Sequence, residues 1–255
     1  MDIRNEAAIY YDFTRPPFDD VPFYKERIPF PEASVLELGC GTGRVLVPLL
    51  DSCGYIHGID LSGCMLQICR EKISQTGVPS GKVRVETGDI SSFDLERRFD
   101  LIIAPYRVFQ NLETDAQIDG LFRCVGKHLA RNGSCILNVF HPWPLDRIQQ
   151  AWGSDQEHFL SETPVPGGRL VRHERKQRMD LKKQILYPEM IYRRYEDQSL
   201  VDEAHLRICM RFYYPEQFEK LATDHGFSII GRWGGYNGEP YGEGQELVVQ
   251  FTRNV

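Results

Sequence analysis

The chain has 255 residues, of which 42% are hydrophobic and 26% charged, a composition typical of a globular protein with a sizeable core in one large domain. Its net charge of −6 at pH 7 disfavours non-specific binding to nucleic acid or to an anionic membrane. No stretch approaches the ~18 consecutive apolar residues of a membrane span, and the N-terminal residues lack the apolar segment of a secretory signal, so we expect a cytoplasmic protein.

The first half of the chain alternates strand-like and helix-like segments. Short continuous apolar runs predict buried strands, and segments with helical spacing separate them. Ser62 is suited to cap the start of one helix, and Gly77 lies just past its end. This alternation favours a parallel sheet with helices on both faces. We expect strands over 34–38, 55–60, 82–87, 99–104 and 134–140, and helices over 44–52, 62–75 and 114–130.

The pattern changes to amphipathic, period-two segments from about residue 168. Two extended segments with a turn near Asp180, and a third over 203–212, predict an antiparallel insertion. A helix over 215–225 and a hairpin of 227–233 with 246–252 then return the chain to the main sheet. We therefore expect an N-terminal arm (1–30), a core (31–142), an insertion acting as a lid (143–213), and a C-terminal helix and hairpin completing the sheet (214–255).

The most informative motif is Glu37-Leu-Gly39-Cys-Gly41-Thr-Gly43, between a predicted strand and a predicted helix. Glycines at such a junction let the backbone turn sharply and approach a ligand closely. The Gly-x-Gly-x-Gly spacing differs from the Gly-x-Gly-x-x-Gly of dinucleotide sites. The motif therefore indicates a ligand site at the end of the first strand, with a carboxylate beside it.

Two further strand ends carry carboxylates. Asp60 ends the second strand within Gly-Ile-Asp-Leu-Ser, where a carboxylate can accept hydrogen bonds from both hydroxyls of a ribose. Asp89 follows the third strand within Gly-Asp-Ile, where it can accept from the exocyclic amine of adenine. Successive parallel strands end at one edge of a sheet, so these side chains should converge on one crevice.

These motifs resemble those of the class I S-adenosylmethionine (SAM)-dependent methyltransferases. Residues 37–44 are similar to the first motif of that family, Gly-Ile-Asp-Leu-Ser to the second and Gly-Asp-Ile to the third. The resemblance covers roughly residues 30–142 and the C-terminal hairpin. It implies an α/β, Rossmann-like seven-stranded methyltransferase sheet with helices on both faces, an antiparallel β insertion as a lid, SAM as the cofactor, and S-adenosylhomocysteine as its product.

The same resemblance implies which residues touch the cofactor. Backbone atoms of Gly39, Cys40 and Gly41 would contact the methionine part, and Glu37 would support their loop. Asp60 would hold the ribose. From the N-terminal arm, Tyr11 would cover the cofactor and Arg15 would pair with the methionine carboxylate. The other expected cofactor-binding residues are Gly43 in the loop, Leu61 and Met65 beside adenine, Gly88, Asp89 and Ile90 at the edge of adenine, and Ala104 at the end of the fourth strand.

Candidate catalytic residues follow the fourth and fifth strands or come from the arm. Tyr106 either lies against the sulfonium and orients the acceptor, since aromatic faces attract cations, or packs as a wall. His141 is either a base or acceptor contact, or a structural histidine. Tyr11 is the third candidate. The segment after residue 104 also resembles the loop of small amine and aminosugar N-methyltransferases, many of which have histidine where Asn111 stands.

Methyl transfer from a sulfonium is an in-line displacement in which alignment supplies much of the catalysis. We predict transfer from SAM to N or O of a small-molecule metabolite by a monomer or homodimer, without nucleic acid, membrane or metal. Seven basic residues between 169 and 183 either attract an anionic acceptor or form a solvated strand face. The alternatives are a SAM-binding regulatory protein without turnover, a protein or RNA methyltransferase, and a nicotinamide-dependent dehydrogenase.

Overall fold

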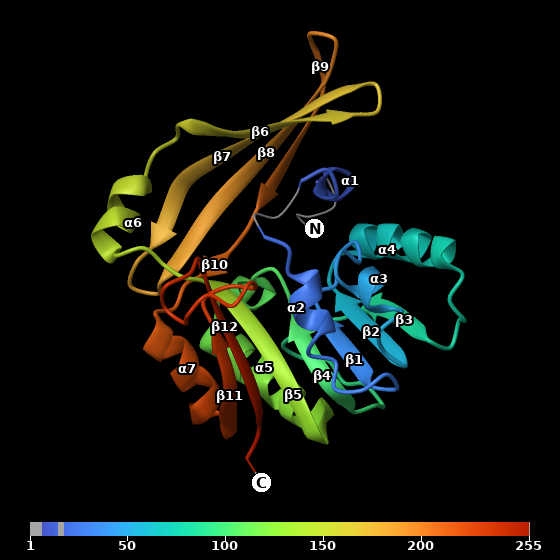
Figure 1. Ribbon diagram of the computed structural model, residues 1–255. Coiled ribbons are helices and arrows are strands. Elements are labelled where there is room, and N and C mark those ends of the chain that lie inside the picture. The colour runs from blue at the N-terminus through green and yellow to red at the C-terminus, as the bar shows by residue number, and fades with distance from the viewer. Residues whose placement is uncertain (1–6, 15–17, 255) are drawn as a thin grey trace.

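The computed structural model describes residues 7–14 and 18–254, which form a seven-stranded sheet and a five-stranded sheet. The smaller sheet stands beyond one end of the larger, as the orange and yellow strands at the top of Figure 1 show. In the part of the chain described here, no helix is long and apolar enough to cross a membrane.

The main sheet has the strand order β11-β12-β5-β4-β1-β2-β3. The five strands from β5 to β3 are parallel, whereas β12 is antiparallel to both β5 and β11. This order confirms the seven-stranded sheet and the C-terminal hairpin expected from the sequence. The strands are β1 (Ser34–Leu38), β2 (Tyr55–Asp60), β3 (Val83–Thr87), β4 (Phe99–Ala104), β5 (Leu129–Phe140), β11 (Phe227–Trp233) and β12 (Glu246–Arg253).

Helices cover both faces of this sheet, as predicted. Successive strand residues point to opposite faces: Val35 belongs to the apolar cluster under α2, α3 and α4, whereas Leu36 belongs to the cluster under α5 and α7. The inner strands β1, β2 and β4 are buried on both faces, which explains why they are largely apolar. The helices are α2 (Val21–Lys25), α3 (Leu46–Leu49), α4 (Gly63–Thr76), α5 (Asp115–His128) and α7 (Pro215–Asp224).

Local capping fixes the ends of the longer helices. The Ser62 hydroxyl accepts from the Met65 N–H at the start of α4, and Gly77 ends that helix with a left-handed φ of 71°. Thr114 and Gln117 form a capping box at the start of α5. The helix expected over 44–52 is shorter, because Gly43 has a φ of 79° and the chain completes a turn before α3 begins.

The insertion between β5 and α7 is an antiparallel sheet preceded by one short helix, α6 (Leu145–Ala151). Its first strand, β6, was not predicted, because it is an edge strand with no buried residue and thus lacks the apolar alternation that identifies a strand. The strands are β6 (Glu157–Val165), β7 (Gly168–Asp180), β8 (Ile185–Glu196), β9 (Ser199–Arg207) and β10 (Met210–Arg211).

Candidate functional site

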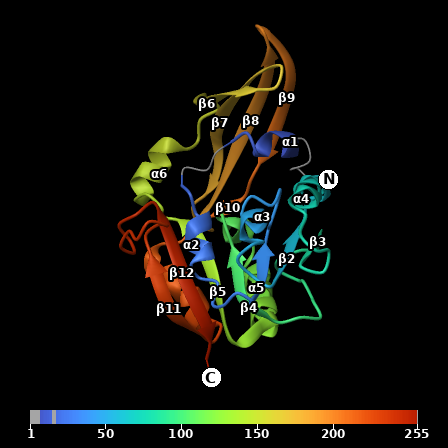
Figure 2. The ribbon, with the colours of Figure 1, turned by 45° about the vertical axis from the view of Figure 1, so that its right-hand side comes forward.

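A cavity of about 270 Å³ lies between the carboxyl ends of β1, β2 and β4 and the insertion. Figure 2 shows the insertion strands above this end of the main sheet, with α1 (Ala8–Tyr11) between them. The core contributes the glycine loop, Asp60 and the segment after β4, while the insertion contributes polar and apolar side chains from β7, β8, β9 and β10. The cavity therefore joins the motifs of the core to the predicted lid.

The glycine loop begins where β1 ends and forms one wall of the cavity. The N–H groups of Gly39 and Cys40 both donate to the Ile59 carbonyl, at 2.8 and 3.0 Å, which holds the loop against β2. Gly39 has a φ of 68°, and a Cβ there would lie 2.5 Å from the Val108 side chain. Gly41 has a φ of 51°, and a Cβ there would make ordinary contact with the Met65 sulfur at 3.5 Å. The loop thus presents bare backbone to a ligand.

Asp60 is buried at the end of β2 and organises the same loop. Its Oδ2 accepts from the Gly41 N–H at 2.9 Å, and its Oδ1 accepts from the Ser62 N–H at 2.8 Å. Asp60 also lines the cavity. It therefore holds the glycine loop at the position where a carboxylate would meet the hydroxyls of a ligand.

Glu37 is the buried polar group that best tests the fit of a cofactor. Its carboxyl lines the cavity and is only 2% exposed, yet Oε2 has no hydrogen-bond partner among the described residues. Burial raises the pKa of Glu37 well above its usual value, and the nearby Arg44 opposes this shift. A ligand ammonium group would satisfy the free oxygen and favour its charged form. The site therefore fits the methionine end of SAM.

The turn after β4 is conformationally strained. Tyr106 and Arg107 have φ values of 55° and 65°, a left-handed region that costs non-glycine residues on the order of 1–3 kcal/mol each. The Asn138 Oδ1 accepts from the Arg107 N–H at 3.1 Å, and the Arg107 guanidinium pairs with the buried Glu246 carboxylate, Nε to Oε1 being 3.0 Å. Asn138 also donates to Glu246 at 2.8 Å. This network holds the turn that carries Tyr106 into the cavity wall.

The Tyr106 ring has neighbours on several sides. Its centroid lies 6.4 Å from that of Tyr11 and 5.8 Å from that of Phe18, both in edge-to-face orientations. The Arg44 guanidinium carbon lies 5.2 Å from the ring centroid, and Asp20 neutralises that arginine through a 2.8 Å bond. These contacts hold the Tyr106 ring in one orientation beside the cavity. That orientation is compatible both with a contact to the sulfonium and with simple packing.

The N-terminal arm connects the core to the insertion. Asp12 accepts from Thr42 of the glycine loop at 2.7 Å and pairs with Lys72 of α4, also at 2.7 Å. On the other side, the Tyr10 hydroxyl donates to Asp202, and its ring stacks on Tyr192 of β8 at 6.1 Å. The arm thereby places Tyr11 in the cavity lining.

The structure brings together only part of the predicted site. The cavity is lined by Tyr11, Glu37, Gly39, Cys40, Gly41, Asp60, Met65 and Tyr106. The lining does not include Gly43, Leu61, Gly88, Asp89, Ile90, Ala104 or His141. Arg15 lies outside the described residues.

The positions of the residues outside the lining are specific. Leu61 is 56% exposed. The Asp89 Oδ1 accepts from the Ser91 N–H at 2.8 Å and thus caps a turn. The His141 Nδ1 lies 3.0 Å from the Gly244 carbonyl, to which it donates. The cofactor and catalytic roles of these residues remain predictions.

The insertion contributes lining residues that were not predicted individually, and Arg172 was expected only as one of seven basic residues that attract an anionic acceptor or form a solvated strand face. Arg172 and Glu174 lie on one face of β7, and Tyr192 is the cross-strand neighbour of Arg172 on β8. Period-two spacing along 168–180 places Arg172 and Glu174 on a common face, but it does not indicate which face meets the core. Asn111, at the end of the 3₁₀ turn η1 (Val108–Asn111), also lines the cavity.

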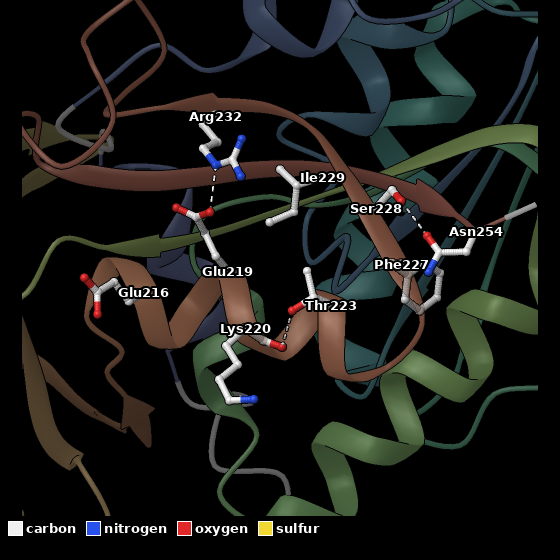
Figure 3. A pocket seen from close by; sticks show the side chains of 9 residues that line it. All are labelled: Glu216, Glu219, Lys220, Thr223, Phe227, Ser228, Ile229, Arg232 and Asn254. Atoms are coloured by element: carbon white, nitrogen blue, oxygen red, sulfur yellow. Dashed lines mark hydrogen bonds and ion pairs between the residues drawn. The ribbon is translucent and has the colours of Figure 1, made fainter.

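A second hollow lies on the outer surface of the sheet, between α7 and β11, and contains none of the motif residues. Figure 3 shows that its polar side chains interact with one another: Arg232 donates to Glu219 at 2.8 Å, and Ser228 donates to Asn254. The polar groups of this hollow satisfy one another, and the residues that line it do not come from the carboxyl ends of β1, β2 and β4. The first cavity is therefore the candidate site.

Comparison with known proteins gives the same assignment for the core. Residues 35–133 match the family model described as methyltransferase domain. The chain is 31% identical over 111 residues, 44% of its length, to dTDP-3-amino-3,6-dideoxy-alpha-D-glucopyranose N,N-dimethyltransferase of Streptomyces fradiae. It is 32% identical over 141 residues, 53% of its length, to malonyl-[acyl-carrier protein] O-methyltransferase of Priestia megaterium. The matches span only 40% and 47% of those two relatives.

The likeness in structure extends over nearly the whole chain. An S-adenosylmethionine-dependent methyltransferase from Clostridium acetobutylicum has a TM-score of 0.80 and 19% sequence identity, with 98% of each chain covered. At that identity the likeness establishes the fold, including the insertion. Residues 35–133 therefore match the methyltransferase domain family, and the chain as a whole has a Rossmann-like methyltransferase fold.

Proposed function

We propose that this protein transfers a methyl group from SAM to a nitrogen or oxygen of a small molecule. The observation that carries the proposal is the convergence on one cavity of the glycine loop, Asp60 and the Glu37 carboxyl, whose Oε2 has no hydrogen-bond partner among the described residues. The loop offers exposed backbone, the Asp60 carboxylate can accept hydrogen bonds from hydroxyl groups, and the Glu37 carboxyl can accept one from an ammonium group. These properties match the chemistry of SAM. They come from two successive strand ends, which explains how a βα fold assembles them.

The residues of the core would hold the cofactor. Glu37 would accept from its ammonium group, and Asp60 from its ribose hydroxyls. Met65 lies at the open side of Gly41, its sulfur 3.5 Å from where a Cβ would be, and would pack beside the bound molecule. When bound, SAM supplies an electrophilic methyl group on a good leaving group, so the protein needs chiefly to align the acceptor.

The acceptor would occupy the part of the cavity between Tyr106 and the insertion. Apolar side chains dominate the insertion's share of the lining: Pro188, Met190, Leu206, Ile208 and Met210. A cavity of about 270 Å³ that must also admit the cofactor would exclude acceptors larger than a small molecule or an extended terminal group. Tyr106, Tyr11 and His141 remain the candidates for orienting it or accepting its proton.

The first relative, named as an N,N-dimethyltransferase of a dTDP-linked aminosugar, supports a small acceptor. The second is named as an O-methyltransferase of malonyl-[acyl-carrier protein], so the two names together leave the reactive atom open. We propose a cytoplasmic monomer or homodimer without a nucleic-acid partner, supported by its acidic net charge and its seven free cysteines. A SAM-binding regulator without turnover, and methylation of protein or RNA, are outcomes that the following test separates.

The test measures formation of S-adenosylhomocysteine from SAM by the full chain with panels of aminosugars, primary and secondary amines, and carboxylic acids. We expect acceptor-dependent product with at least one small-molecule class. Asp60→Ala should lose most of that activity at limiting SAM. Tight SAM binding without product from any panel, a protein substrate or total RNA would support the regulator instead. Turnover confined to protein or RNA would contradict the small-molecule proposal.

A further inference from the structure

Arg172 differs from the other basic residues on its strand. Arg169 pairs with Glu162 at 2.9 Å, and Arg175 pairs with both Glu157 and Glu189 at 2.8 Å. These ion pairs neutralise much of the basic run that the sequence shows in the insertion. Arg172 makes no ion pair with any carboxylate among the described residues, and its buried Nε has no hydrogen-bond partner there.

The other two arginines that line the cavity are neutralised. Arg44 pairs with the buried Asp20, and Arg107 pairs with the buried Glu246. Arg172 lines the same cavity without such a partner. Its guanidinium is therefore the cationic group of the lining, within the described residues, that lacks a protein counter-charge.

The surroundings of Arg172 limit what can satisfy it. Glu174, two residues along the same face, has Lys176 at 3.0 Å, so its charge is already offset. Tyr192 lies across from Arg172 on β8, and its ring is fixed by stacking on Tyr10. The Tyr192 hydroxyl shares a hydrogen bond with the Arg172 side chain, but as a neutral group it does not balance the charge of the guanidinium. The remaining insertion side chains of the lining are Pro188, Met190, Leu206, Ile208 and Met210, which provide no acceptor.

We propose that Arg172 binds an anionic group of the methyl acceptor, and that the acceptor is a small molecule with an apolar body and a carboxylate or phosphate. The inference rests on the proposed function. A guanidinium presents a planar fork that can donate two parallel hydrogen bonds to either anion. Apolar side chains line the cavity around Arg172, and a guanidinium among apolar groups attracts an anion more strongly than one surrounded by water.

The test uses the full chain saturated with S-adenosylhomocysteine and three probes of similar size: phenylacetate, phenyl phosphate and the neutral phenylacetamide. Calorimetry should show that at least one anion binds about tenfold or more tightly than the amide, a margin expected for a charge-assisted bidentate contact. The preferred anion identifies the acceptor as a carboxylate or a phosphate.

Three variants localise the effect. Arg172→Gln should remove the preference for the anion, and Arg172→Lys should retain part of it. Arg169→Gln is the matched control, because Arg169 pairs with the half-exposed Glu162 and does not line the cavity; it should behave as wild type. Each variant is first required to unfold at the wild-type temperature and to bind S-adenosylhomocysteine normally.

Absence of saturable binding by both anions, equal affinity for anion and amide, or an anion preference that survives Arg172→Gln would overturn the inference. Binding of S-adenosylhomocysteine by the wild-type chain is measured beforehand, and its absence would refute the proposed function. Normal binding of S-adenosylhomocysteine without any preference for an anion would refute the role of Arg172 alone.

Discussion

Replacing Asp60 with alanine should weaken binding of SAM and S-adenosylhomocysteine more than it weakens the fold. The change removes the acceptor of two backbone N–H groups, those of Gly41 and Ser62, and of any ribose hydroxyl. A hydrogen bond to a charged group contributes roughly 1.5–3 kcal/mol. Loss of one such ligand bond lowers affinity by about tenfold or more, and the loosened glycine loop adds to that loss.

Asp60→Asn separates the two roles of this residue. Its carbonyl oxygen can keep one of the two backbone bonds, while its amide group cannot accept from the other N–H or from a ribose hydroxyl. We therefore expect stability between those of wild type and Asp60→Ala, with ligand affinity close to that of Asp60→Ala.

Isothermal calorimetry with S-adenosylhomocysteine gives the affinity, and thermal unfolding gives the stability. Asp51→Ala, a change at an exposed aspartate outside the cavity lining, is the control and should leave both unchanged. If folded Asp60→Ala binds S-adenosylhomocysteine within twofold of wild type, Asp60 does not hold the ribose and the assignment of the second motif is wrong.

Glu246→Gln should lower the free energy of unfolding in urea by at least ~1.5 kcal/mol and reduce turnover, because it removes the charge that pairs with Arg107. Unchanged turnover would mean that the geometry of the turn at Tyr106 and Arg107 does not matter for catalysis. Tyr106→Phe should retain turnover within about threefold if the ring acts as a wall, whereas a loss of 10²-fold would indicate a proton-transfer role. Asp12→Ala should speed dissociation of S-adenosylhomocysteine in stopped-flow measurements, because the arm loses its hydrogen bond with Thr42 and its ion pair with Lys72; an unchanged rate would argue against the arm as a cover. The hydrogen bond with Glu203, and then that with Glu189, raises the pKa of His205. Its contribution to stability should be full below the unfolded pKa of about 6.5 and fall as pH rises through the higher folded value. Thermal unfolding should show this decline in wild type but not in His205→Gln, and identical profiles would contradict it.

Local sequence signals were sufficient for most of the main sheet. The expected strands 34–38, 55–60, 99–104 and 227–233 coincide with β1, β2, β4 and β11. β1, β2 and β4 are buried on both faces and are largely apolar, whereas β11 is an edge strand in which burial alternates along the chain. The caps Ser62 and Gly77 were identifiable because capping depends on residues near in sequence.

Features that depend on distant residues could not be predicted in this way. The left-handed turn at Tyr106 and Arg107 is held by Asn138 and Glu246, the latter 139 residues beyond Arg107. From the sequence, Arg172 could not be distinguished from the other basic residues of its run. The ion pairs that neutralise Arg169 and Arg175 form with carboxylates on other strands, and the sequence does not specify the register of those strands. The acceptor half of the site is built from such contacts, whereas the cofactor half follows from motifs at strand ends.

Calorimetric titration of the full chain with S-adenosylhomocysteine, with NAD as a parallel titrant, tests the cofactor assignment most directly. We expect saturable binding of S-adenosylhomocysteine at one site per chain and no heat from NAD. Absence of binding by both S-adenosylhomocysteine and SAM on folded protein, or saturable binding of NAD in their place, would contradict the proposed methyltransferase.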